Sequence, residues 1–540
     1  MTVIQSRIST SSEAFQNNRR DMLALIERME ELNARAGLIS EKRKPRFEQR
    51  GQLTPRERLS RLIDPGMPWL SIGNISGYLA DTKDEAKSIP GSTMLCGIGF
   101  IRGVRCIVLV DDSGIKGGTL TTATGYKIQR AERIALEQKL PFVHLVESGG
   151  ADLYNYTVEG FVSGGGLFSG QAKLSKAGIP VITVLHGSST AGGAYMPGMS
   201  DYVVGVKKNG KAFLAGPPLL KAATGEIATD SELGGAEMHA TVSGLIEYLA
   251  ENDSDAMILA REVVNRLQWN RRCPPVPTVA ARPPVYDPGE IAGVVPVDYR
   301  IPYDVREVIA RVVDGSEFLE FKPGYGASTV CGQAEVMGFG FGIVGNNGPI
   351  DPDGATKTAQ FLQLMDQSDL PVVFLSNTTG YMVGTQYEQG GMIKHGSKMI
   401  QAVTNIEVPR LTFQIGASYG AGNYGMCGRG FEPDFLYIWP NASTGVMGGE
   451  QAATVMRIVA EGRAKALGQE PDEAALKKQD AVLTEIFDGQ ASSFYTSGHN
   501  LDDGMIDPRD TRKALGFLLS TVWEARNRDV RTNSFGIARM

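Results

Sequence analysis

Runs of apolar residues alternate with amphipathic stretches along this chain. Apolar and β-branched residues predominate at residues 105–110, 142–147 and 181–185, as they do in buried strands. Between these runs, residues 126–139 and 164–176 have the spacing of helices with one apolar face. Strands that alternate with helices in this order predict an α/β fold.

Helices are also predicted nearer the N-terminus. Residues 12–36 place Met22 and Ile26 on one apolar stripe. A shorter helix is predicted to begin after Thr54, which can cap it, with Pro55 at the first helical position. Near the C-terminus, helices are predicted at residues 448–467 and within residues 502–527.

The chain contains the same pattern twice. The segment GIPVITVLHGSSTAGGAYMPGM at residues 178–199 is repeated in scheme by EVPRLTFQIGASYGAGNYGMCG at residues 407–428, with Pro180 over Pro409 at an offset of 229. Other residues in register are Pro141 with Pro371, Lys127 with Lys357, Arg56 with Arg306 and Asp64 with Asp314. We therefore predict a duplicated fold.

A proline-rich segment separates the two copies. Eight prolines lie within residues 274–302, and the part PPVPTVAARPPVYDP is predicted to form neither a regular helix nor a central strand. We therefore predict one domain at residues 1–285 and a second at residues 286–540.

Small residues follow the strand in each copy of the repeat. Residues 187–194 read GSSTAGGA, which lets the backbone approach a ligand closely, and the amides at the next helix start carry positive partial charge. Such amides can form an oxyanion pocket from main chain alone. For one copy, a tight turn whose glycines only ease packing is an equal alternative. Two copies favour two pockets, which suit a transfer between substrates that each develop negative charge on an oxygen.

Composition narrows the classes of function. The chain has 540 residues, of which 42% are hydrophobic, so it can bury a large core, and its net charge of -6 gives no basic surface for nucleic acid or an anionic membrane. We expect no membrane span and no signal peptide, and hence a cytoplasmic protein, or one of the mitochondrial matrix in a eukaryote, although no clear transit peptide is seen. Five scattered cysteines without a CxxC pair argue against a metal site and a disulfide framework.

Side-chain catalysis has weak candidates. None of the usual nucleophile, phosphate-loop, zinc or dinucleotide motifs stands in a convincing setting. His144 and His186 lie in or after predicted buried strands, which favours core or supporting roles. His395 is as well explained by a helix surface as by catalysis.

Specific motifs resemble those of the carboxyltransferase subunit of biotin-dependent acyl-CoA carboxylases. The motifs are SSTAGGAYMPG, FLAGPPLLKAATGE, ELGGAEMH, ASYGAGNYGM, GVMGGEQAA and DDGMIDPRDTR, and the resemblance covers nearly the whole chain. It implies two duplicated crotonase-like (ββα superhelix) domains. It also implies that the first domain binds acyl-CoA and the second binds carboxybiotin, with the active site between the first domain of one copy and the second domain of another.

The resemblance assigns roles by position. Gly192 and Gly193 would donate their amides to the thioester enolate, and Ala421 and Gly422 to the ureido oxygen of biotin. The remaining acyl-side residues would be Ser148, Gly149, Gly150, Gly164, Gly165, Gly166, Phe168, Ala191, Ala194 and Tyr195. The remaining biotin-side residues would be Thr379, Gly380, Tyr381, Tyr419, Gly420 and Asn423. Lys116, Lys127 and Lys221 lie beside the predicted turns and are candidates to contact CoA, although each also fits a plain surface lysine.

The substrate branch rests on two segments. Asn377 to Tyr381 read NTTGY, which looks like the methylcrotonyl-CoA and geranyl-CoA branch, whereas propionyl- and acetyl-type members have Asp-Thr-Pro-Gly-Phe. Gly164 to Gly166 leave space for a longer, geranyl-like acyl chain, or else they form a flexible loop. A propionyl-CoA or other acyl-CoA carboxylase, a biotin-dependent decarboxylase and a noncatalytic scaffold stay open as alternatives.

A partner is implied by what the motifs lack. No ATP-binding carboxylase motif and no biotinylated lysine are seen, since Lys398 and Met399 continue a helical pattern. The resemblance therefore implies an alpha subunit that carries the biotin carboxylase and the biotin carrier. It implies no covalently bound cofactor on this chain, and a homodimer within a larger ring, a hexamer.

Overall fold

Two sheets with the same strand order carry the fold, one in each of two units of the chain. The computed structural model describes residues 2–277 and 281–533. Unit 1 contains residues up to Glu30, residues 281–497 and Leu501–Leu519, and unit 2 contains Glu31–Pro277, Gly498–Asn500 and residues 520–533. Each unit is described by itself.

The sheet of unit 2 has seven strands in the order β10-β8-β6-β5-β4-β3-β2. Strands β2 to β4 pair antiparallel, whereas β4, β5, β6, β8 and β10 run parallel. The short strands β7 and β9 form a separate parallel pair. Their bounds are Leu70–Ser71 (β2), Met94–Ile101 (β3), Val104–Asp111 (β4), Phe142–Val146 (β5), Val181–Leu185 (β6), Ser188–Thr190 (β7), Tyr202–Val206 (β8), Lys211–Phe213 (β9) and Tyr248–Ala250 (β10).

The sheet of unit 1 repeats this topology in the order β1-β11-β12-β13-β14-β15-β16, with β17 paired to the end of β15. Strands β11 to β13 are antiparallel and β13 to β16 are parallel. The bounds are Thr2–Val3 (β1), Glu317–Phe321 (β11), Thr329–Val336 (β12), Phe339–Asn346 (β13), Val372–Thr378 (β14), Arg410–Tyr419 (β15), Phe435–Ile438 (β16) and Ser443–Gly445 (β17). Two sheets of one topology confirm the predicted α/β fold and its duplication.

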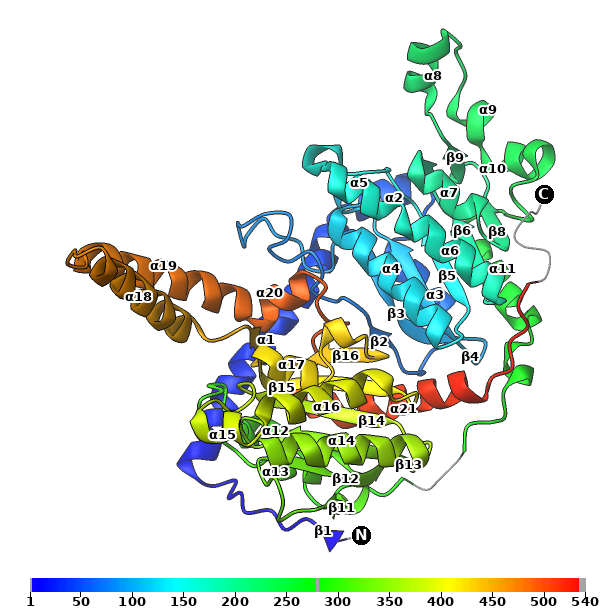
Figure 1. The fold of residues 1–540 in the computed structure, drawn as a ribbon. Helices are drawn as coiled ribbons and strands as arrows, with labels where there is room; N and C mark the ends of the chain where they lie inside the picture. The colour runs from blue at the N-terminus through cyan, green and yellow to red at the C-terminus, as the bar shows by residue number, and fades with distance from the viewer. Residues whose placement is uncertain (1, 278–280, 534–540) are drawn as a thin grey trace. The chain divides into compact units, whose positions relative to one another are not determined.

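Helices connect the parallel strands (Figure 1). In chain order they are α1 (Glu13–Glu41), α2 (Lys44–Gln49), α3 (Pro55–Leu62), α4 (Thr122–Glu137), α5 (Val158–Gly164), α6 (Gly166–Ala177), α7 (Gly192–Gly198), α8 (Pro217–Thr224), α9 (Asp230–Gly234), α10 (Ala236–Met238), α11 (Asp253–Arg266), α12 (Ile291–Val294), α13 (Val305–Val312), α14 (Pro352–Gln367), α15 (Thr385–Gln389), α16 (Met392–Asn405), α17 (Gly420–Gly425), α18 (Gly449–Ala466), α19 (Glu473–Ala491), α20 (Ser493–Gly498) and α21 (Thr511–Asn527). Single 3₁₀ turns lie at Lys116–Gly118, Leu153–Asn155, Trp269–Arg272, Pro288–Glu290, Asp314–Ser316, Arg429–Phe431 and Pro508–Asp510, and a π turn at His239–Ser243.

Local sequence explains where several helices begin. Helix α3 has the predicted cap: the Thr54 side chain accepts the Glu57 amide, and the Glu57 carboxylate accepts the Thr54 amide. Helix α1 is longer than predicted, and its stripe is buried at Met22, Ile26 and Met29. Helices α18 and α19 form a hairpin. The sequence predicted α18 but not α19. The two helices pack side by side (Figure 1).

An aspartate closes the β3–β4 hairpin of unit 2. The Asp64 carboxylate accepts the amides of Arg102 and Gly103 at 3.0 and 2.7 Å, and both residues have positive φ, 54° and 73°. The Arg261 guanidinium on α11 donates to the same carboxylate at 2.7 Å. The turn is therefore tied to a helix distant in sequence.

Unit 1 repeats this arrangement. The Asp314 carboxylate accepts the amides of Met337 and Gly338 at 3.0 and 2.9 Å, again at a turn with positive φ, and Arg512 on α21 donates to it at 2.6 Å. The predicted register of Asp64 with Asp314 thus reflects one structural device used twice.

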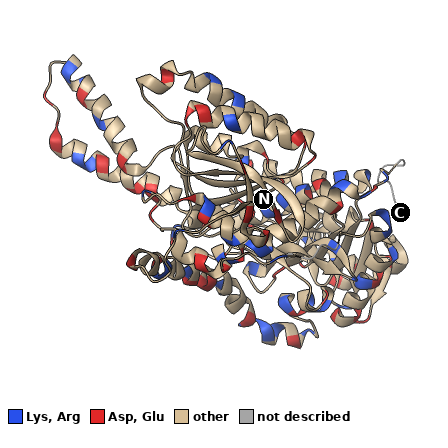
Figure 2. Ribbon diagram, turned by 90° about the horizontal axis from the view of Figure 1, so that it is seen from below, with Lys and Arg blue, Asp and Glu red and all other residues tan. Residues whose placement is uncertain are grey.

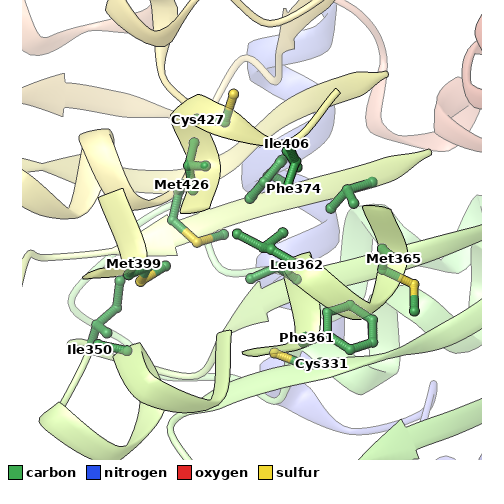
Figure 3. Packing of buried hydrophobic residues seen from close by; sticks show 14 of the residues in the cluster. Cys331, Ile350, Phe361, Leu362, Met365, Phe374, Met399, Ile406, Met426 and Cys427 are labelled. Atoms are coloured by element: carbon green, nitrogen blue, oxygen red, sulfur yellow. The ribbon is translucent and has the colours of Figure 1, made fainter. Parts of the chain in front are cut away.

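The core of unit 1 lies between the sheet and helices α14 and α16 (Figure 3). Phe361 and Leu362 on α14 are buried against Phe374 of β14, and Met399 of α16 is fully buried. Other buried members of this cluster are Cys331, Val344, Ile350, Ala355, Met365, Val372, Met392, Val403, Ile406, Val408, Met426 and Cys427. Dense packing of this kind fixes α14 and α16 against β14.

The proline-rich segment is irregular where the structure describes it. Residues 274–277 and 281–287 contain no helix or strand, as predicted, and residues 278–280 lie outside the described residues. Among the described residues, every helix is too short or too polar to cross a lipid bilayer.

Candidate active site

The predicted acyl-side amides lie where β5 and β6 end in unit 2, and we call this predicted site the first pocket. The turn after β5 carries Ser148, whose hydroxyl accepts the Gly150 amide at 3.2 Å. The amide of Thr190 in β7 donates to the Ser148 carbonyl at 3.3 Å, so the segment that leads into α7 lies against this turn. Ala191 follows with φ 53° and ψ −119°, which turns the chain into α7.

The first two residues of α7 are the predicted donors. Gly193 is packed tightly, since a Cβ there would lie 3.0 Å from the Ser189 hydroxyl and 3.1 Å from the Ser148 Cβ. Gly192 has more room, with the Phe168 ring 3.5 Å from such a Cβ. Amides in the first turn of a helix have no intrahelical acceptor, so both are available to an oxygen in the pocket.

The predicted biotin-side amides, which we call the second pocket, lie in the same local arrangement in unit 1. The Thr378 hydroxyl accepts the Gly380 amide at 3.2 Å, as Ser148 does for Gly150. A Cβ on Gly422 would lie 2.8 Å from the Thr378 Cγ2 and 2.9 Å from the Gly380 Cα. Gly422 therefore stands against Thr378 as Gly193 stands against Ser148, and Ala421 takes the place of Gly192.

Each pocket has an exposed rim. In the first, Gly149, Ala191 and Tyr195 are exposed, and the Tyr195 ring meets Phe168 edge-on with centroids 5.7 Å apart. Ala194 is buried beneath them. In the second, Thr379 is exposed and Gly420 is half-buried, with φ 53°.

The sequence reasoning missed Tyr424 of the second rim. It is 49% exposed, and Tyr195 is 48% exposed. Tyr424 lies over Tyr195 at the repeat offset of 229, which is the signal that could have found it. The second rim therefore also has an exposed aromatic side chain.

Three predicted biotin-side residues use their side chains inside the unit. The Tyr381 hydroxyl donates to the Gly396 carbonyl at 3.3 Å, and the Asn423 amide donates to the Ser418 hydroxyl at 2.8 Å. Tyr419 is 3% exposed, with its hydroxyl 2.7 Å from that of Ser443. Burial raises the pKa of Tyr381 and of Tyr419 above the usual range. These side chains support the pocket, and contact with a ligand would fall to its backbone and to Thr379.

The glycines at the predicted acyl pocket mark a helix break. Gly165 is both the C-cap of α5 and the N-cap of α6, and an added Cβ at Gly164 would meet open space. At Gly166 such a Cβ would lie 3.0 Å from the mobile end of Gln129. Open space therefore lies at Gly164, Gly166 is closely approached by Gln129, and a pocket for the acyl chain at this segment stays a prediction.

The structure does not support the three predicted CoA lysines equally. Lys127 is 2% exposed, its ammonium donates to the carbonyls of Gly91 and Met94 at 2.7 and 2.9 Å, and burial lowers its pKa to about 8. Its counterpart Lys357 donates to the Gly326 carbonyl at 2.9 Å. We therefore correct the prediction for Lys127, which is a structural residue.

The other two lysines lie at the surface. The Lys116 ammonium pairs with Asp81 at 3.2 Å and with Asp152 at 3.7 Å. Lys221 is exposed on α8. Lys116 is thus already neutralised, which weakens its case as a phosphate contact.

Arginines that the sequence analysis did not select line a cavity at the first pocket. The cavity measures about 160 Å³, and Arg43, Arg46 and Arg50 share its wall with Gly149 and Ser188. All three arginines are exposed and have no ion pair among residues 2–277 and 281–533. Elsewhere acidic and basic residues are mixed along the helices (Figure 2). An unpaired group of three arginines in an acidic protein favours an anionic ligand.

His144 and His186 are buried, as their strands predicted, and each ring contacts a carboxylate. His144 Nε2 lies 3.0 Å from Asp111, and His186 Nδ1 lies 2.9 Å from Asp253. Burial, and then the charge of Arg58, lower the pKa of His186, so its imidazole is neutral. On α16, His395 Nδ1 lies 2.9 Å from the Thr356 hydroxyl.

Known proteins resemble this chain over almost its whole length. Residues 46–535 match the carboxyl transferase domain family. A probable biotin-dependent acyl-coenzyme A carboxylase beta2 subunit of Mycobacterium tuberculosis is 49% identical over 92% of each chain. The mitochondrial methylcrotonoyl-CoA carboxylase beta chain of Dictyostelium discoideum is 42% identical over 100% of this chain and 91% of its own.

A solved structure agrees with the sequence matches. The crystal structure of the beta subunit of geranyl-CoA carboxylase from P. aeruginosa superposes with a TM-score of 0.93 at 50% identity, over 100% of both chains. The resemblance inferred from the motifs, the crotonase-like fold and the enzyme class are confirmed. The chain belongs to the carboxyl transferase domain family.

Proposed function

We propose that this chain is the carboxyltransferase subunit of a biotin-dependent acyl-CoA carboxylase, and that it carboxylates the γ carbon of a branched α,β-unsaturated acyl-CoA. The observation that carries this proposal is the pair of amide pockets built on the same plan, Gly193 against Ser148 and Gly422 against Thr378. In a carboxyl transfer of this kind, the thioester oxygen and the ureido oxygen of biotin gain negative charge. Each pocket would donate hydrogen bonds to one of them.

The first pocket would act on the acyl thioester. Loss of a γ proton from a conjugated thioester places negative charge on the thioester oxygen. The amides of Gly192 and Gly193 would hold that oxygen as it becomes an enolate. Each preorganised donor of this type contributes roughly 3 kcal/mol to lowering a barrier.

The second pocket would act on carboxybiotin, which serves as the carboxyl donor. Its nitrogen–carboxyl bond breaks, a bond from the carboxyl carbon to the γ carbon forms, and the γ proton passes to the biotin nitrogen. The amides of Ala421 and Gly422 would hold the ureido oxygen while it carries charge. Thr379 and Tyr424 on the rim would contact the biotin ring.

Arg43, Arg46 and Arg50 would bind the phosphates of CoA. The cavity that they line also includes Gly149 of the turn beside the thioester pocket. A ligand with a thioester at one end and phosphates at the other could then span from the amides to the arginines. Guanidinium groups suit phosphate because they donate two parallel hydrogen bonds.

The acyl tail would pass Phe168 and Tyr195. We propose geranyl-CoA before 3-methylcrotonyl-CoA, because Gly164 to Gly166 carry no side chain that would block a longer chain, and an added Cβ at Gly164 would meet open space. The solved relative with a TM-score of 0.93 is named for geranyl-CoA, which supports the same choice.

The chain would work as part of a larger assembly. We propose an alpha subunit that carries the biotin carboxylase and biotin carrier functions, since the relatives are beta subunits. We also propose a homo-oligomer of dimers, a hexamer, without a covalent cofactor on this chain, in the cytoplasm or, in a eukaryote, the mitochondrial matrix. The purified chain alone should be inactive with ATP and bicarbonate, and should run well above its 58.1 kDa chain mass on a sizing column.

Steady-state kinetics of the complex across geranyl-, 3-methylcrotonyl-, propionyl- and acetyl-CoA test the proposal. We expect the highest kcat/KM with geranyl-CoA. Gly165→Phe should lower it for geranyl-CoA more than for 3-methylcrotonyl-CoA, because a filled pocket excludes the longer chain first. A preference for propionyl-CoA would overturn the substrate, and activity only as decarboxylation of a carboxylated acyl-CoA would overturn the direction.

A further inference from the structure

A buried charged cluster lies beneath the first pocket. Arg58 on α3 is fully buried, its Nη1 donates to Glu147 at 2.7 Å and its Nε donates to Asp253 at 2.9 Å. Glu147 and Asp253 are also buried. One guanidinium therefore joins two carboxylates from different elements, the end of β5 and the start of α11.

Two more side chains complete this cluster. His186 Nδ1 donates to Asp253 at 2.9 Å, which leaves Nε2 buried and without a hydrogen-bond partner among the described residues. The Gln52 side-chain amide donates to the His186 carbonyl at 3.0 Å and to Glu147 at 3.4 Å. We call Gln52, Arg58, Glu147, His186 and Asp253 the acyl-side network.

The acyl-side network holds both edges of the first pocket. Glu147 directly precedes Ser148, and His186 directly precedes Gly187 at the end of β6. At Gly187 the two edges touch, since a Cβ there would lie 2.6 Å from the Glu147 carboxyl group. A shift of the Glu147 carboxylate would therefore move the Ser148 turn relative to the segment that carries Gly193.

The second pocket is held without charge. Asn377 lies over Glu147 in the repeat, and its side-chain oxygen accepts the Ala417 amide at 3.1 Å. A Cβ on Gly416 would lie 2.3 Å from that oxygen, so the close contact at Gly187 is repeated. The positions of Arg58 and His186 are taken by the buried residues Val308 and Ile415.

We propose that the acyl-side network is a set of positioning residues, which fix the distance between the Ser148 turn and the Gly192–Gly193 amides. Asn377 does the same for the second pocket with one neutral side chain. A buried ion pair is seldom the most stabilising choice for a core, since apolar replacements are often neutral or better. Unit 1 also buries an ion pair, Arg311 with Glu307 at 2.9 Å, but the second pocket has Asn377, Val308 and Ile415 at the places of Glu147, Arg58 and His186. A buried charged cluster at the first of two matching pockets therefore points to a need of the acyl side. That side must hold an enolate oxygen.

Hydrogen exchange of the purified chain tests the network without any substrate. Glu147→Gln removes a charge but keeps the shape, and it should speed exchange at residues 148–150 and 187–193 at least about tenfold. Exchange at residues 378–380 and 417–422 should stay the same. The matched control is Glu524→Gln, which removes another buried arginine pair, that of Glu524 with Arg105 at 3.0 Å. This control should leave both sets of residues unchanged.

Kinetics of the assembled complex supply the second readout, and this part rests on the proposed function. Glu147→Gln should lower kcat about tenfold or more, as loss of a supporting partner does, with the apparent KM for the acyl-CoA within twofold. Gln52→Met is a milder variant that keeps volume, and it should lower kcat in the same direction. Glu524→Gln should keep the kcat of the unmodified chain.

Three results decide the matter. Unchanged exchange at residues 148–150 in Glu147→Gln, or an equal increase in Glu524→Gln, would overturn the network. A full kcat in both Glu147→Gln and Gln52→Met would do the same. Faster local exchange in a chain that carboxylates no acyl-CoA would support the network and count against the proposed function alone.

Discussion

Gly193 lies directly against Ser148, because a Cβ on Gly193 would stand 3.1 Å from the Ser148 Cβ. Gly193→Val should therefore push the first turn of α7 off its position, and carboxylation by the complex should fall about a hundredfold or more, as for loss of an oxyanion donor. Gly192→Ala should lose far less, since its nearest neighbour is the Phe168 ring at 3.5 Å. Normal turnover by Gly193→Val with intact assembly would contradict the assignment of the Gly193 amide as a donor to the thioester oxygen.

At the second pocket, we expect even one added methyl group to impair carboxyl transfer. Gly422→Ala would place a methyl group 2.9 Å from the Gly380 backbone, which has no side chain to move away. We expect carboxyl transfer to fall about a hundredfold. Ala421→Gly, which only removes a methyl group, is the matched control and should cost much less. Equal losses in the two variants would argue that Gly422 has no special place.

The arginines predict an effect on substrate affinity. Reversing charge at Arg46 or Arg50 to Glu should raise the apparent KM for acyl-CoA about tenfold with little change in kcat, because the phosphates take no part in the chemical step. Arg266→Glu, on the exposed face of α11, is the control. The effect should weaken as salt rises. An unchanged KM in both variants would contradict phosphate binding by these arginines and leave Lys116 and Lys221 as the candidates.

Asp502 predicts a pH dependence of stability. Burial raises its pKa to about 7, whereas a free aspartate titrates near 3.9. The folded state therefore binds more protons than the unfolded state between these values, so this group makes the free energy of unfolding fall as the pH rises from about 4 to about 7. Above about pH 7 the loss in the free energy of unfolding due to Asp502 is complete.

Asp502→Asn should remove that cost. Its melting temperature should exceed that of the unmodified chain at pH 8 by on the order of 2 °C, and should not do so at pH 4.5. Asp503→Asn is the control and should lower the melting temperature at pH 8, because the Asp503 carboxylate is paired with Arg429 at 2.9 Å and accepts the Leu436 amide at 2.8 Å. A difference between Asp502→Asn and the unmodified chain that did not vary with pH would contradict the assignment.

Local rules predicted much of the fold. Strand β6 has the predicted bounds, because its sequence VITVL is a run of β-branched and apolar residues, which fits a strand buried on both faces. The cap of α3 follows from Thr54, Pro55 and Glu57 within one turn. The turns that carry the predicted amides follow their strands for the same reason, since the strands and the small residues are contiguous in sequence.

Side chains brought in from a distance were not predictable in this way. Arg43, Arg46 and Arg50 reach the first pocket only through tertiary packing, which no local pattern encodes. Lys127 carried a signal that was available, because it lies on α4 beside the buried residues Thr124 and Ile128, and it recurs as Lys357. A lysine kept in both copies of a duplicated fold is better explained by structure than by a ligand that only one copy binds.

The make-up of unit 1 has a consequence for how the chain folds during synthesis. Strand β1 pairs with β11, and the Glu307 carboxylate accepts the Ser6 hydroxyl and the Arg7 amide at 2.6 and 2.8 Å. These first residues leave the ribosome before all of unit 2, and their partners emerge only afterwards. Asp314 in turn waits for Arg512, 198 residues further along the chain. Contacts this far apart in sequence form slowly. Strand β1 is therefore exposed to chaperones, and to unpaired strand edges of neighbouring nascent chains, until β11 has been made.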